Sequence, residues 1–292
     1  MKVCIIGLGL IGASMAWQLK SKGHHVTGVA RRQKTLDLAY EQNLIDAGYL
    51  EVCRSALQVD LVVVAVPLEL IVSTIVHIDT FLSSQTLVID VGSVKKHIID
   101  DIKSKYLKKT LFVGGHPMAG SEKTGLENFQ KDLFSGKPFI LCYPSDEVRK
   151  QSTLLLQRFV ADLDATVCEL SAEDHDQRVA AISHLPYILA NTLFNLYLKD
   201  EPSLKEVAST GFLDTTRVAH SDPLWGTMVA LMNKDALIPQ IDAVISSLQL
   251  LKSDISTFNS KGLLARFNVD HVIEGPEKLE RLKEWVKDSP ET

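Results

Sequence analysis

The stretch that decides the fold is the apolar run and glycine-rich loop Lys2-Val3-Cys4-Ile5-Ile6-Gly7-Leu8-Gly9-Leu10-Ile11-Gly12. Its glycines are spaced GxGxxG, and a helix-length stretch over 13–22 follows. In such a turn Gly7 permits the tight bend, Gly9 lets the backbone approach a pyrophosphate, and Gly12 lets the helix pack on the strand. Free N–H groups at the start of the helix hold the phosphates. The segment therefore predicts a dinucleotide-binding turn. Its expected cofactor-contacting residues are Gly7, Gly9, Leu10, Ile11 and Gly12.

Strand-length apolar runs alternate with helix-length stretches through the first half of the chain, which predicts a parallel sheet covered on both faces. After residue 170 strand-like runs are almost absent. Helical patterns begin at a capping Ser171 and recur over 230–258 and 277–286. We predict an α/β fold, a Rossmann-type doubly wound sheet over 1–170 followed by an all-helical domain over 171–292. The predicted strands are 3–6, 25–29, 61–66, 87–91, 111–113, 139–143 and 165–170.

Composition restricts the classes of function. The 292 residues suggest two domains, and 46% hydrophobic with 23% charged residues is ordinary for a globular protein. A net charge of −5 offers no basic excess for nucleic acid, and apolar runs such as 61–66 are far shorter than the ~20 residues that cross a bilayer. Met1-Lys2 leads straight into a strand, so no leader is expected. The cysteines form no CxxC pair, which favours free thiols in the cytoplasm and no metal site. They are Cys4, Cys53, Cys142 and Cys168.

The end of the second strand bears on the choice of cofactor. An acidic residue about 20 residues beyond the glycines would bind the ribose hydroxyls of NAD. Here the strand ends in Ala30-Arg31-Arg32 instead. Because arginine binds phosphate through forked, charge-assisted contacts, Arg31 and Arg32 favour NADP over NAD. The alternative is that both arginines are simply exposed at the end of a strand.

Two further segments follow predicted strands, at the edge where parallel sheets bind ligands. Ser93 lies in the segment 90–95, and we expect it near the nicotinamide or at the cap of a helix. Lys95, in the same segment, is expected on the surface. His116 lies in Gly114-Gly115-His116-Pro117, which predicts a rigid, exposed loop. Histidine is the side chain best suited to move a proton near neutral pH, so His116 is a candidate catalytic base.

The second half holds further candidates. Pro186 cannot donate to the carbonyl of Ile182, so the helix should kink and turn His184 toward a cleft. His175 lies nine residues before His184, which in a regular helix is the opposite face and argues against a shared metal site. His175 and Asp176 are expected to be a structural or positioning pair.

Arg217 lies in a polar segment, 211–218, between helical patterns. A guanidinium there is suited to hold a substrate carboxylate through a forked contact. The alternative is an ion-paired or solvated arginine on the surface.

Five motifs occur in order along nearly the whole chain: GLGLIGAS (7–14), DVGSVK (90–95), GGHPMAG (114–120), AEDHDQRVAAISHLP (172–186) and GFLDTTRVA (211–219). Together they resemble the prephenate/arogenate dehydrogenase family of tyrosine biosynthesis. The non-acidic end of the second strand, the HDQ sequence and DPLWGTM over 222–228 are most similar to the cyanobacterial arogenate dehydrogenases that use NADP.

The resemblance implies an oxidative decarboxylation of a cyclohexadienol that carries a ring carboxylate. Hydride leaves C4 for the nicotinamide, CO2 departs, and the ring becomes aromatic. His116 would then bind the C4 hydroxyl and take its proton, and Ser93 would bridge that hydroxyl and the nicotinamide. His184 and Arg217 would position the substrate. The resemblance also implies a homodimer formed through the helical domain.

Several alternatives remain open at this stage. One is a β-hydroxyacid-type NADP dehydrogenase, although such enzymes rely on a catalytic lysine whose setting is missing here. Another is a non-catalytic NADP-binding sensor. The sequence does not decide between prephenate and arogenate, and it leaves the roles of Glu122 and Trp225 open. We expect the chain to lack a fused chorismate mutase or regulatory domain, so feedback by tyrosine is not assumed.

Overall fold

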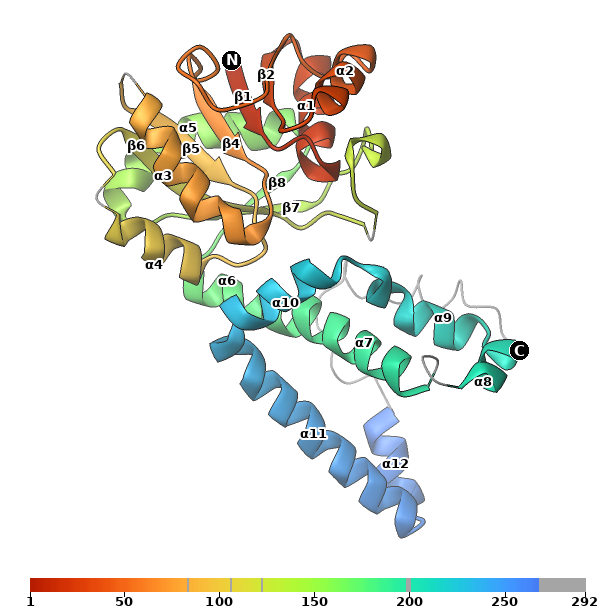
Figure 1. Cartoon of the computed structure of the whole chain (residues 1–292). Coiled ribbons are helices and arrows are strands. Elements are labelled where there is room, and N and C mark those ends of the chain that lie inside the picture. The colour runs from red at the N-terminus through yellow and green to blue at the C-terminus, as the bar shows by residue number, and fades with distance from the viewer. Residues whose placement is uncertain (83, 106, 122, 198–200, 268–292) are drawn as a thin grey trace. The chain divides into compact units, whose positions relative to one another are not determined.

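A computed structural model describes residues 1–267 except 83, 106, 122 and 198–200 (Figure 1). The chain divides into two compact units, Met1–Ile238 and a second that begins at Pro239. Two sequence-based expectations concern residues that the structure does not describe: the helical pattern over 277–286 and the role of Glu122.

The first unit contains an eight-stranded sheet in the order β3-β2-β1-β4-β5-β6-β7-β8. All neighbouring strands are parallel except β6 and β7, which are antiparallel. The order runs outward in both directions from β1 and β4, which confirms the doubly wound fold and places a topological switch point after β1. The strands are β1 (Lys2–Ile6), β2 (His25–Val29), β3 (Ala47–Tyr49), β4 (Leu61–Val64), β5 (Thr86–Asp90), β6 (Thr110–Pro117), β7 (Pro138–Cys142) and β8 (Thr166–Glu169).

Three features of this sheet differ from the sequence prediction. The sequence pattern missed β3, because three residues that include Gly48 form no apolar run. Strand β6 was predicted to end at residue 113, but it continues to Pro117 because its second half pairs with β7. The antiparallel pairing of β6 with β7 was also not expected from the alternating pattern.

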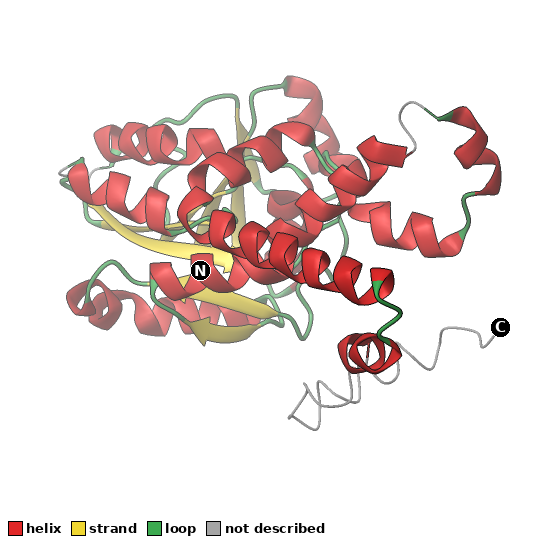
Figure 2. Cartoon of the chain, turned by 90° about the horizontal axis from the view of Figure 1, so that it is seen from below, coloured by secondary structure: helices red, strands yellow, loops and turns green. Residues whose placement is uncertain are grey.

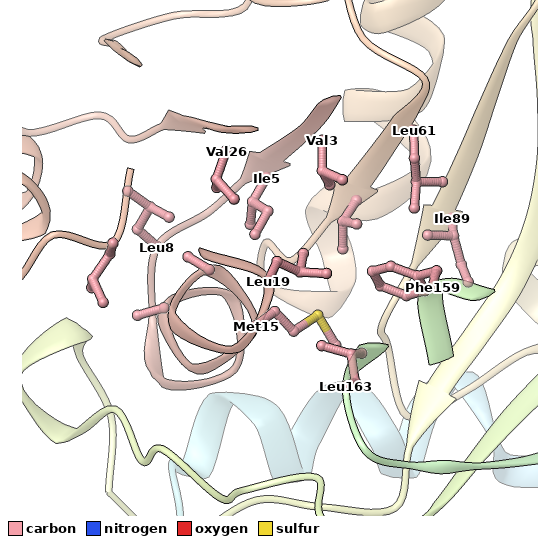
Figure 3. Packing of buried hydrophobic residues seen from close by; sticks show 14 of the residues in the cluster. Val3, Ile5, Leu8, Met15, Leu19, Val26, Leu61, Ile89, Phe159 and Leu163 are labelled. Atoms are coloured by element: carbon pink, nitrogen blue, oxygen red, sulfur yellow. The ribbon is translucent and has the colours of Figure 1, made fainter. Parts of the chain in front are cut away.

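Helices cover both faces of the sheet (Figure 2). On one face α1, α2 and α5 pack against the strands, and on the other face α3 and α4 do so. Figure 3 shows Met15 and Leu19 of α1 pointing toward Val3 and Ile5 of the sheet, with Phe159 of α5 beside them. These helices are α1 (Leu10–Ser21), α2 (Gln33–Glu41), α3 (Ile71–Phe81), α4 (Lys96–Ser104) and α5 (Asp146–Asp162), with short 3₁₀ turns η1 (Leu68–Leu70) and η2 (Leu126–Asn128).

After β8 the described chain is helical. Ser171 caps the first of these helices as predicted, since its hydroxyl accepts from the backbone N–H of Asp174 at 3.0 Å. A kink was predicted near Pro186, and the structure has a π-helical turn just before this residue. The elements are α6 (Ala172–Val179), η3 (Ala180–His184), α7 (Leu185–Tyr197), α8 (Pro202–Val207), α9 (Thr210–Thr216), η4 (Arg217–His220), α10 (Pro223–Met232), α11 (Lys234–Ser256) and α12 (Ser260–Phe267).

By length and hydropathy alone, one stretch within the described residues, Ala172–Tyr197, could span a membrane. Its first half carries three fully or almost fully buried polar side chains, His175, Asp176 and His184. Buried polar side chains of this kind fit a helix that packs within the protein.

Candidate active site

The glycine loop has the geometry that a dinucleotide requires. Gly7 has a φ of +98°, and a Cβ there would lie 2.3 Å from the carbonyl oxygen of Ala65. A Cβ on Gly12 would lie 2.0 Å from the carbonyl oxygen of Gly7. Gly9, at the N-cap of α1, faces open space, and no side chain caps this end of the helix. The N–H groups of Leu10 and Ile11 belong to this uncapped turn. The cradle therefore fits a pyrophosphate, which would be held by backbone N–H groups.

The end of β2 presents two cationic side chains. Ala30 is buried against the sheet, and Arg31 and Arg32 beyond it are exposed. Arg32 occupies the N-cap of α2. Residues 30–32 include no carboxylate, at the position where an acidic residue would bind the ribose hydroxyls of NAD.

A buried ion pair lies at the carboxyl end of β5. Lys95 and Asp90 are both fully buried, and the Nζ of Lys95 donates to Oδ2 of Asp90. The carboxylate also accepts from the backbone N–H groups of Gly92 at 2.9 Å and Gly115 at 3.1 Å. The expectation that Lys95 is a surface residue in a helix is wrong. It precedes α4 and neutralises a carboxylate that ties the Ser93 segment to β6.

His116 lies in strand β6 and only 9% of its surface is exposed, so the predicted exposed loop is also wrong. The neighbouring glycines have a different reason to be there. A Cβ on Gly115 would lie 2.5 Å from the carbonyl oxygen of Asp90, and one on Gly114 would lie 3.0 Å from Cδ of Lys95. The glycines let β6 pass close to β5 and leave room for the buried lysine.

His116 heads a chain of hydrogen bonds that the sequence did not reveal. Its Nδ1 lies 2.8 Å from Nε2 of His175, whose Nδ1 lies 2.6 Å from Oδ1 of Asp176. Asp176 accepts in turn from the backbone N–H groups of Lys95 at 2.8 Å and Lys96 at 3.0 Å, at the start of α4. The sequence indicated the pair His175–Asp176 but not its contact with His116.

Burial keeps these histidines neutral. Desolvation holds the pKa of His116 well below its ordinary value of 6.5, and the nearby His175, Lys95 and His184 lower it further. The pKa of His175 is also lowered, mainly by burial. Burial lowers the pKa of His184 to about 4, although nearby Asp176 opposes the shift. His175 and His184 thus lie close enough to influence each other, despite the opposite faces expected of a regular helix. Among the described residues no cluster of side chains is suited to a metal ion.

Ser93 and His184 meet beside an aromatic residue that had no assigned role. The indole N–H of Trp225 donates to Oγ of Ser93 at 3.1 Å. The ring of Trp225 makes edge contacts with the rings of His184 and Tyr187, at centroid distances of 6.2 Å and 5.2 Å. Nδ1 of His184 lies 3.1 Å from the amide nitrogen of Asn233. Ser93 does not cap α4, since the N-cap position is Lys95.

The signal that could have indicated Trp225 is its neighbour Gly226. A Cβ there would lie 2.2 Å from the ring of Tyr187, so only glycine lets α10 approach α7 this closely.

Arg217 is exposed and begins η4. The segment 211–218, predicted as polar chain between helices, is itself helical over α9 and η4, and both elements pack against α7. The candidate carboxylate clamp is therefore presented on a helix that is braced by its neighbour.

Comparisons with known proteins agree with this architecture. Residues 15–169 match the family model "Prephenate dehydrogenase, nucleotide-binding domain", and residues 171–269 match "Prephenate dehydrogenase, dimerization domain". A prephenate dehydrogenase of Lactococcus lactis subsp. cremoris is 32% identical over 98% of this chain and 78% of its own length.

Two solved structures are similar over almost their full length. The Synechocystis arogenate dehydrogenase is 31% identical, with a TM-score of 0.75, and the match covers 99% of both chains. The prephenate dehydrogenase of A. aeolicus, in complex with hydroxyphenyl propionate and NAD+, is 28% identical, with a TM-score of 0.83 and 99% and 98% coverage. With a glycine cradle, a buried neutral histidine and both family domains in sequence, the chain belongs to the prephenate dehydrogenase family.

Proposed function

We propose that this chain is an NADP-dependent dehydrogenase of tyrosine biosynthesis that oxidatively decarboxylates arogenate, prephenate or both. The observation that carries the proposal is His116, a buried and neutral imidazole whose Nδ1 is already engaged by His175. Such a group can accept a proton at Nε2 near neutral pH. Ser93, held by Trp225, supplies a hydroxyl in the same cluster.

The proposed chemistry balances without a further reactant. Nε2 of His116 accepts the proton of the C4 hydroxyl while the C4 carbonyl forms. A dinucleotide held by the glycine cradle at Gly7, Gly9 and Gly12 would supply the acceptor for the hydride that leaves C4. The bond from C1 to the ring carboxylate then breaks, CO2 leaves, and its electron pair moves through the ring to the C4 oxygen. His116 returns its proton to that oxygen, which gives the phenol. Arg217 and His184 position the substrate, with Arg217 on a carboxylate.

Product stoichiometry tests the proposed reaction. With either cyclohexadienol and NADP+, we expect reduced cofactor and CO2 in equal amounts. A chain that instead oxidises β-hydroxyacids and releases no CO2 from either cyclohexadienol would contradict the proposal. A chain that binds NADP+ but turns over no substrate would support the sensor alternative.

Ala30→Asp should weaken or reverse the preference for NADP+. A carboxylate at the end of β2 repels the 2′-phosphate and offers an acceptor to the ribose hydroxyls of NAD. Because a hydrogen bond to a charged group contributes about 1.5–3 kcal/mol, we expect kcat/KM with NADP+ to fall by roughly tenfold or more. Arg31→Ala should act in the same direction. Arg158→Ala, at an exposed arginine of α5, is the control. A wild-type enzyme that prefers NAD+ would contradict the proposed preference for NADP+.

We also propose that residues 1–170 bind the dinucleotide and that residues 171–292 form a homodimer. Large apolar side chains are exposed on the helices of the second segment, including Ile182 (67%) and Leu196 (67%). Contiguous apolar surface on helices is typical of protein–protein interfaces, which supports the proposal. Light scattering at micromolar concentration should give twice the chain mass of 32.3 kDa. Leu196→Asp should weaken the dimer, whereas Leu154→Asp on α5, where the leucine is 83% exposed, should not. A strictly monomeric wild-type protein would refute this proposal.

A further inference from the structure

We propose that His175 and Asp176 are positioning residues that fix the tautomer of His116, so that its Nε2 always carries the free lone pair. The inference rests on the proposed function, because it assigns a task to groups that stand behind the proposed base. Asp176 lies at the far end of the hydrogen-bonded chain from His116.

Asp176 is held as an acceptor by its surroundings. Its two carboxylate oxygens accept from consecutive backbone N–H groups, those of Lys95 and Lys96, where α4 begins. The positive end of a helix dipole favours a negative charge at this place. The backbone carbonyl of Asp176 accepts from the amide of Asn233 at 2.9 Å, which fixes α6 at this point.

The direction of each remaining hydrogen bond follows from that carboxylate. Asp176 can only accept, so Nδ1 of His175 must carry a proton and donate to it. His175 is fully buried and neutral, so its Nε2 holds a lone pair and accepts from Nδ1 of His116. A neutral His116 protonated at Nδ1 has an unprotonated Nε2. Among the described residues no hydrogen bond engages that atom, and His116 keeps its exposed 9%.

This ordering matters because free neutral histidine favours the opposite tautomer, with its proton on Nε2. A His116 in that form would offer a donor to the C4 hydroxyl and could not act as a base. A carboxylate that holds an imidazole in the working tautomer is a known catalytic device, and there the wrong tautomer can cost about 10⁴-fold in kcat. Here the same device acts through a second histidine.

The hydrogen bonds through His175 and Asp176 also stabilise the positive charge that forms on His116. Once Nε2 takes a proton, the Nδ1–H bond to His175 becomes charge-assisted, and His175 in turn contacts the carboxylate of Asp176. The cation is thus favoured while the reaction proceeds. In the resting enzyme burial and Lys95 disfavour it.

The test is ¹⁵N NMR of the full-length enzyme labelled in its histidines, with His116 assigned by its loss in His116→Asn. We expect protonated Nδ1 and unprotonated Nε2 in the wild type near neutral pH. In His175→Leu, which removes the acceptor, signal should move to the form protonated at Nε2. Its kcat should fall by at least roughly tenfold, and by no more than the roughly 10⁴-fold that a lost base costs, while the KM for cofactor stays near wild type.

Two variants separate positioning from general stability. His175→Gln keeps an acceptor at the position of Nε2 and should retain more kcat than His175→Leu. His24→Leu is the matched control, because His24 is also a buried histidine paired with an aspartate, Asp162, at 2.8 Å but outside the site. It should change neither kcat nor the tautomer of His116.

A wild-type His116 protonated at Nε2 would overturn the inference, and so would a His175→Leu enzyme whose tautomer or kcat is unchanged. The NMR result does not depend on the substrate. If the expected tautomer is found but no cyclohexadienol is oxidised, the proposed function fails and the tautomer assignment stands.

Discussion

His116→Asn should lower kcat by roughly 10²–10⁴-fold, the usual contribution of a positioned acid or base. Asparagine keeps a polar group in strand β6, but it cannot take the proton of the C4 hydroxyl. The Kd for NADP+ should stay near wild type, because the glycine cradle lies on other segments of the chain. Steady-state rates and a cofactor titration measure the two quantities separately. His97→Asn, at an exposed histidine of α4, is the control. A variant with near-normal kcat would shift the role of base to another residue, with His184 next in line.

The same assignment fixes the pH dependence of the wild type. Since kcat/KM reports ionisations of the free enzyme, its acid limb should follow His116. The pKa of His116 lies well below 6.5, mainly because of burial, with His175, Lys95 and His184 lowering it further, so the base is already neutral at pH 6.5 and above. We expect kcat/KM to hold its plateau down to about pH 6.5 and to fall only below it. An acid limb above 6.5 would show that another group controls activity.

Lys95→Met should be the most destabilising of these substitutions, by about 3–5 kcal/mol, because it leaves the carboxylate of Asp90 buried without its counter-charge. Chemical denaturation monitored by tryptophan fluorescence measures the change in free energy of unfolding. The substitution should also raise the pKa of His116, since it removes a nearby positive charge and leaves a negative one uncompensated. The acid limb of kcat/KM should then move to higher pH.

Two further variants show whether the buried charge is responsible. Asp90→Asn combined with Lys95→Met removes both charges and should recover part of the lost stability. Lys96 is the next residue and forms an exposed ion pair with Asp100. Lys96→Met breaks that pair and should change the free energy of unfolding little. If Lys95→Met changes the free energy of unfolding as little as Lys96→Met does, the ion pair does not hold the Ser93 segment to β6.

The sequence predicted those parts of the fold that leave a local pattern. Buried parallel strands read as short apolar runs, and β2 was predicted at its observed bounds, His25–Val29. The glycine loop was predicted correctly because each of its glycines meets a local requirement of the backbone. The short strand β3 was not predicted, since three mixed residues leave no periodic signal. Strand β7 was predicted over 139–143, but its antiparallel direction was not, because the direction of pairing leaves no periodic signal either.

The site was predicted in its chemistry more than in its setting. His116 and Ser93 were indicated by motif, yet the burial of His116 and Lys95 depends on contacts between β5, β6 and the segment before α4. Such contacts join residues far apart in the chain, as in the bond between Trp225 and Ser93, 132 positions apart. His175 and Asp176 are adjacent in the sequence, so their pairing was predicted. Their contact with His116 was not, because His116 lies in β6, 59 residues before His175. The local sign of these long-range contacts is a glycine next to a site residue, as in 114–116 and 225–226, because the missing Cβ lets another segment pack closely there.

The proposed reaction and cofactor are tested together by one matrix of initial rates, with prephenate and arogenate each supplied with NADP+ and with NAD+. We expect measurable kcat/KM for at least one of the two cyclohexadienols, with the higher value in the NADP+ column. Activity confined to β-hydroxyacids, or no turnover in any of the four combinations by an enzyme that binds cofactor, would contradict the proposed function.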